Sequence, residues 1–79
     1  MLGAWHGLPP VISGKQARTA FSRDGWIFIS QKGSHMKMVK EGFPTRLIIP
    51  DHKTLDRGTL RSLIRKSGLT VDEFINLIE

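Results

Sequence analysis

The residues from Gln31 to His35 carry the clearest chemical signal in this sequence. The segment reads Gln-Lys-Gly-Ser-His, and a further lysine, Lys37, follows two positions after the histidine. The imidazole of histidine has an unperturbed pKa of about 6.5, so it can exchange a proton near neutral pH. Lysine side chains beside it could hold a phosphate group while it does so. This pattern is suited to cleavage of RNA without a metal ion.

RNA supplies its own nucleophile, the ribose 2′-hydroxyl, so an enzyme need only move protons and stabilise charge on the phosphate. Acid–base catalysis by one positioned group is worth roughly 10²–10⁴-fold in rate. We take His35 as that group, with Lys32 and Lys37 stabilising the phosphate. Backbone N–H groups around Gly33 could add to this, because glycine permits close approach. His52 would be a second proton-transfer group only if its loop folds back toward this segment.

The composition favours a single domain that meets a polyanion. Twelve lysines and arginines against seven aspartates and glutamates give the 79-residue chain a net charge of +5. Small basic domains usually bind nucleic acid or an acidic protein, although solubility alone would also explain the charge. The chain has no cysteine, which excludes disulfides and a thiol nucleophile. No apolar run approaches the roughly 20 residues of a membrane span and the N-terminus lacks a signal peptide pattern, so we expect a cytoplasmic protein. The three histidines share no metal-ligand spacing, so we expect no metal ion, and we expect no cofactor or small-molecule ligand.

Three short strands are expected around the Gln31–His35 segment. They cover residues 26–31, 35–40 and 45–49, which are rich in β-branched and aromatic residues or alternate in polarity. The turns between them are too short for a crossover connection, so neighbouring strands must run antiparallel.

Alternation of side chains assigns residues to the two faces of this sheet, with Met36 and Met38 on one face and His35 and Lys37 on the other. We expect the buried face to hold, beside the methionines, Ile27, Ile29, Leu47 and Ile49. The opposite face would hold Trp26, Phe28, Val39 and Ile48. These four could stack bases, receive a partner protein or pack under a loop. A register shift of one residue would reverse both assignments.

A glycine- and proline-rich segment, residues 1–10, precedes the first predicted helix. Its composition indicates a flexible arm, so we place the folded domain at residues 11–79. Ser13 and Gln16 match a capping box that opens the helix, and Gly25 ends it.

A second helix is expected over residues 57–67, with Asp56 as its N-cap and Gly68 as its stop. Three arginines spaced four apart form a cationic stripe on one side of this helix: Arg57, Arg61 and Arg65. The stripe could hold RNA phosphates, meet an acidic partner, or be a solvated face. The segment from Thr70 to Glu73 is another capping box and opens a last turn or two of helix.

The order helix, three strands, helix is that of the double-stranded-RNA-binding fold. This α-β-β-β-α domain of the α+β class has a three-stranded antiparallel sheet with helices on one face. Three blocks of the sequence resemble the HicA family of bacterial toxins, in the same order. Residues 11–15 resemble the family's opening, Gln31–His35 its catalytic turn, and Pro50-x-His52 with residues 58–65 its C-terminal block. The resemblance extends over nearly everything from Val11 onward.

The resemblance implies an mRNA interferase, a toxin that cuts mRNA and is neutralised by a HicB-type antitoxin. Carried over by position, His35 would be the catalytic histidine. The expected RNA contacts are Lys32, Gly33, Ser34, Lys37, Arg57, Arg61 and Arg65. Two other functions stay open. One is a non-catalytic RNA-binding module of the same fold, and the other is a degenerate toxin that only binds an antitoxin or acts as a DNA-binding co-repressor.

Overall fold

The structure is a computed structural model that describes residues 9–78. Most of the arm predicted over residues 1–10 lies outside this range, so the boundary at residue 11 stays a prediction. Pro9 and Pro10 are both buried.

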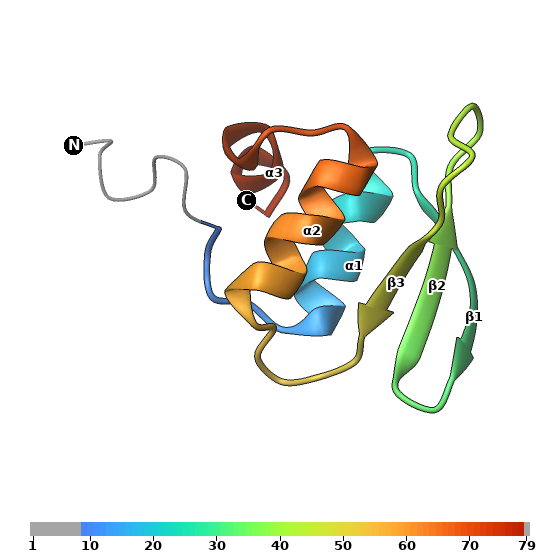
Figure 1. Ribbon diagram of the computed structural model, residues 1–79, viewed down its shortest axis with the longest axis horizontal. Helices are drawn as coiled ribbons and strands as arrows, with labels where there is room; N and C mark the ends of the chain where they lie inside the picture. The colour runs from blue at the N-terminus through green and yellow to red at the C-terminus, as the bar shows by residue number, and fades with distance from the viewer. Residues whose placement is uncertain (1–8, 79) are drawn as a thin grey trace.

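The helices lie on one side of a three-stranded antiparallel sheet whose strand order follows the chain, and the last helix packs against the first two rather than against the sheet (Figure 1). The elements in chain order are α1 (Gly14–Arg23), β1 (Ile27–Lys32), β2 (His35–Val39), β3 (Leu47–Pro50), α2 (Arg57–Ser67) and α3 (Val71–Ile78). This arrangement confirms the predicted α+β class and the placement of helices on one face. Among these helices, none is long and apolar enough to cross a membrane.

Each helix begins directly after the capping residue that the sequence indicates. In the first capping box, the Gln16 N–H donates to Ser13 Oγ at 3.0 Å, and the Ser13 N–H donates to Gln16 Oε1 at 2.9 Å. The Thr59 N–H donates to the Asp56 carboxylate at 2.9 Å at the start of α2. Thr70 and Glu73 make the same reciprocal pair of hydrogen bonds before α3. These bonds satisfy backbone donors that no helical carbonyl can reach.

The core lies between the helices and the inner face of the sheet. Four strand side chains are fully buried there, from β2 and β3: Met36, Met38, Leu47 and Ile49. They pack against apolar residues of the helices, including Phe21 of α1 and Phe74 of α3, whose ring centroids are 4.8 Å apart. All four had been predicted to face inward.

The prediction for the first strand was wrong. Ile27 and Ile29, expected in the core, are 63% and 53% exposed, whereas Trp26 is buried and Phe28 packs against the core. Val39 and Ile48 do lie on the outer face, as predicted. Val39 is the cross-strand partner of Ile27, and Ile48 is that of Lys37, and paired residues share a face.

The physical reason is the way β1 enters and crosses the sheet. The Trp26 N–H donates to the Phe21 carbonyl at the end of α1, which fixes the indole over the core. Phe28 then pairs with Met38 on the inner face. The register shifts between Phe28 and Ser30, so one additional residue occupies β1 there. Such a bulge changes the alternation along the strand, and the sequence pattern gave no sign of it.

The start of α1 lies directly on the end of β3. Gly14 is buried, its N–H donates to the His52 carbonyl at 2.9 Å, and a Cβ at this position would overlap the Pro50 carbonyl oxygen. Glycine is therefore required here by close approach of two backbones rather than by an unusual backbone angle.

We expect Gly14→Ala to destabilise the fold by about 1–3 kcal/mol, because α1 must move away from Pro50. Gly58→Ala is the matched control, since a Cβ there would meet only the Asp56 carboxylate at an ordinary contact distance of 3.4 Å. Alanine favours a helix by about 0.5–1 kcal/mol over glycine, so this control should match or exceed the wild type. Urea unfolding measures both variants, and equal stability of the two would contradict this account of the junction.

Candidate functional site

The histidine singled out by the sequence lies at the first position of β2, directly after a two-residue turn. Gly33 and Ser34 form the turn, and Lys32 and His35 are partners across it. Gly33 has a φ of +60°, while Ser34 has a negative φ. Glycine at the first central position is typical of a type II′ turn, whose twist suits a hairpin. The residue types of this turn thus fix the spacing between Lys32 and His35.

The side chains of Lys32, His35 and Lys37 lie on the outer face of the sheet. Met36 is buried beneath the helices, so its neighbours along β2 must point the other way. Lys32 shares their face because it is the direct partner of His35. His35 and Lys32 are exposed and Lys37 is half-buried. The structure therefore gathers the predicted histidine and two predicted lysines at one end of the hairpin, open to solvent.

Asp51, which directly follows β3, attaches this turn to the rest of the domain. Its backbone N–H donates to the Ser34 carbonyl at 2.6 Å, which ties the turn to the residue that follows β3. The side-chain amide of Gln31 bridges the two, donating to the Gly33 carbonyl at 3.0 Å and to the Asp51 carboxylate at 3.0 Å. The turn thus has two separate attachments to the body of the domain.

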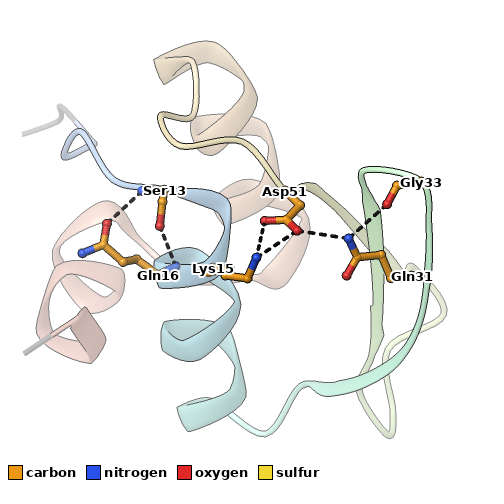
Figure 2. A network of polar contacts seen from close by, with 6 residues as sticks. All are labelled: Ser13, Lys15, Gln16, Gln31, Gly33 and Asp51. Carbon is orange, nitrogen blue, oxygen red and sulfur yellow. Dashed lines mark hydrogen bonds and ion pairs between the residues drawn. The ribbon is translucent and has the colours of Figure 1, made fainter.

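Lys15, at the first turn of α1, completes the network. Its ammonium group lies 3.1 Å from both carboxylate oxygens of Asp51 (Figure 2). The hydrogen bond from Lys15, and after it that from Gln31, holds the pKa of the Asp51 carboxyl below its usual value. The network connects α1, β1 and the end of β3 at the point where His35 is presented.

The role of Asp51 was not predicted from the sequence, although this residue lies inside the Pro50-x-His52 block. The contacts of Asp51 join positions 20 and 36 residues apart, so no local pattern could indicate them.

The arginine stripe lies on a different layer from the turn. Arg57, Arg61 and Arg65 are exposed on α2, while the opposite side of that helix carries the buried Leu60 and Ile64. Because α2 covers the inner face of the sheet and His35 lies on the outer face, the structure does not bring the stripe and the histidine onto one face.

The other two histidines have different positions. The His52 side chain is exposed, and its backbone carbonyl accepts the hydrogen bond from Gly14. His6 lies outside the described residues. Across residues 9–78, no group of three or more histidine, aspartate or glutamate side chains is placed to hold a metal ion.

The element order, the antiparallel sheet and the single helical face are those of an α+β fold like that of double-stranded-RNA-binding domains. Residues 14–69 match the family model described as the HicA toxin of bacterial toxin-antitoxin, which covers well over half of the chain. The chain therefore belongs to the HicA toxin family, and is the toxin of a toxin–antitoxin system. No curated protein matches the chain.

We expect the Asp51 contacts to stabilise the fold in a pH-dependent way. Because the folded state lowers this pKa, the carboxylate stabilises the protein above its unfolded-state pKa of about 4. That contribution is lost as the pH falls through the lower, folded-state pKa. The stability advantage of the wild type over Asp51→Asn should therefore be full at neutral pH and narrow in acid.

Urea unfolding over a series of pH values measures this difference. Glu41→Gln, in the exposed loop between β2 and β3, is the control and should show no comparable trend. An Asp51→Asn deficit that stays constant from neutral pH into strong acid would show that the ionised form of the Asp51 carboxylate adds no stability.

Proposed function

We propose that this toxin is a metal-independent endoribonuclease that cleaves mRNA, with His35 as its acid–base catalyst. The observation that supports the proposal is an exposed histidine between two lysines on a turn that is held from behind by Asp51 and Gln31. Membership of the HicA toxin family adds to it.

The reaction would use the RNA's own 2′-hydroxyl. Removal of its proton lets the 2′-oxygen attack the adjacent phosphorus, and the bond to the 5′-oxygen breaks as that oxygen gains a proton. The products are a 2′,3′-cyclic phosphate, or the 3′-phosphate formed from it by water, and a 5′-hydroxyl end. His35 would move one of these protons. Lys32 and Lys37, on the same face, would stabilise the negative charge that builds on the phosphate oxygens.

Rigidity of the turn matters for this chemistry, because proton transfer depends on the placement of the imidazole. The Ser34 carbonyl is held by the Asp51 N–H, and the Gly33 carbonyl by the Gln31 amide. A misplacement of about 1 Å can cost roughly 10²-fold in rate. These contacts would therefore serve His35 without touching the RNA themselves.

A HicB-type antitoxin would neutralise the toxin by covering the outer face of the sheet. That face combines the basic residues around His35 with exposed apolar side chains, Ile27 at 63% and Ile48 at 43%. A partner surface with apolar residues at its centre and acidic residues toward His35 would complement it.

We expect His35→Ala to lower the rate of RNA cleavage by roughly 10²–10⁴-fold and to abolish growth arrest on expression in bacteria, with unchanged stability. The control is Arg46→Gln, which removes a charge beside Leu47, at the opposite end of the sheet from His35. Cleavage by the wild type should continue in the presence of a chelator and leave cyclic or 3′-phosphate ends. Equal cleavage or equal toxicity from wild type and His35→Ala would contradict the assignment and favour a module that acts by binding RNA.

A further inference from the structure

A groove of about 330 Å³ lies on the helical side of the sheet, away from the His35 face. Its lining residues come from one side of α1 and from the paired strands β1 and β2: Lys15, Arg18, Thr19, Ser22, Phe28 and Met38. Phe28 and Met38 are cross-strand partners on the inner face. Because β1 is an edge strand, this groove is bordered by the free edge of the sheet.

Arg18 is the distinctive residue of the groove. Its guanidinium carbon lies 3.8 Å from the centroid of the Phe28 ring, so the planar cation rests on the aromatic face. Such stacking leaves the N–H donors of the guanidinium directed outward around its rim.

Other cations nearby are already paired. Lys15 binds Asp51, Lys40 binds Asp24, and Arg23 donates to carbonyls at the end of α3. Arg18, by contrast, meets no carboxylate or carbonyl acceptor within residues 9–78, although it is half-buried. An anion that entered the groove would find these donors already oriented, so little conformational entropy would be lost on binding.

Two hydroxyl groups of the groove can act only as acceptors in this conformation. Thr19 Oγ1 donates its hydrogen to the Lys15 carbonyl at 3.1 Å, and Ser22 Oγ donates to the Thr19 carbonyl at 2.7 Å. Both side chains are exposed, and each oxygen retains lone pairs. The groove therefore offers donors for an anion beside acceptors for a hydroxyl group. RNA carries both partners, a phosphate and a 2′-hydroxyl, whereas DNA lacks the second.

We propose that this groove binds a segment of single-stranded RNA that flanks the point of cleavage. Arg18 would bind a phosphate, and Thr19 and Ser22 would accept hydrogen bonds from ribose 2′-hydroxyls. This inference extends the proposed nuclease function, since it supplies a substrate site separate from the chemistry.

The position of Lys15 supports a continuous path for the RNA. Lys15 lines one end of the groove and also binds Asp51, which Gln31 connects to the turn that carries His35 (Figure 2). A strand leaving the turn along the edge of β1 would enter the groove.

The test measures binding of a fluorescent single-stranded RNA and of the DNA of the same sequence to His35→Ala protein, which leaves the RNA intact if His35 is catalytic. Adding Arg18→Gln should weaken RNA binding roughly 3–10-fold and lower the salt dependence by about one phosphate contact. Adding Arg46→Gln instead is the charge-matched control. Equal affinities and salt slopes for the two variants, with folding verified, would overturn the proposal.

A second comparison isolates the hydroxyl groups. The pair Thr19→Val and Ser22→Ala should reduce the preference for RNA over DNA by roughly 3–10-fold and leave DNA binding unchanged. An unchanged preference would overturn the role of the 2′-hydroxyl.

The binding assays keep this site distinguishable from the nuclease itself. If the wild type does not cleave RNA but Arg18→Gln still weakens RNA binding, the proposed nuclease function is wrong and the RNA-binding role of the groove is supported. If the wild type cleaves RNA and Arg18→Gln binds RNA like its control, the RNA-binding role of the groove is wrong and the nuclease function is supported.

Discussion

The structure depends on the contact between the start of α1 and the end of β3. Gly14 lets two backbones meet at Pro50, and its N–H is satisfied by the His52 carbonyl. Between these two contacts lies Asp51, whose backbone holds Ser34 and whose carboxylate holds Lys15. One junction therefore orients the helical layer against the sheet and fixes the turn that presents His35. Because isolated ion pairs at a surface contribute little to stability, the backbone contacts account for most of this orientation.

In β2, side chains that stabilise the core alternate with side chains that could take part in the reaction. Burial of Met36 and Met38 obliges His35 and Lys37 to face outward, since adjacent side chains alternate. A slip of one residue would bury a histidine and a lysine and expose both methionines, at a large cost in free energy. The core thus enforces the exposure that the proposed reaction requires.

Features governed by neighbouring residues could be predicted from the sequence. The capping residues predicted the start of each helix, and the glycine of the turn predicted the hairpin between β1 and β2. The faces of β1 could not be predicted, because the bulge after Phe28 and the attachment of Trp26 to α1 depend on tertiary packing. The stack of Arg18 on Phe28 was missed for the same reason, since Phe28 had been assigned to the opposite face. The exposed position of His35 was predicted correctly, but the residues that hold its turn are distant in the chain.

The central claim is that the hydrogen bonds from Asp51 and Gln31 to the turn position His35 for proton transfer. Single-turnover cleavage of a short RNA by Gln31→Ala, measured beside its RNA affinity, tests it most directly. Loss of the Gln31 bridge should lower the cleavage rate, by up to about 10²-fold, while the RNA affinity stays at the wild-type value. An unchanged cleavage rate, or a loss explained entirely by weaker RNA binding, would contradict the claim.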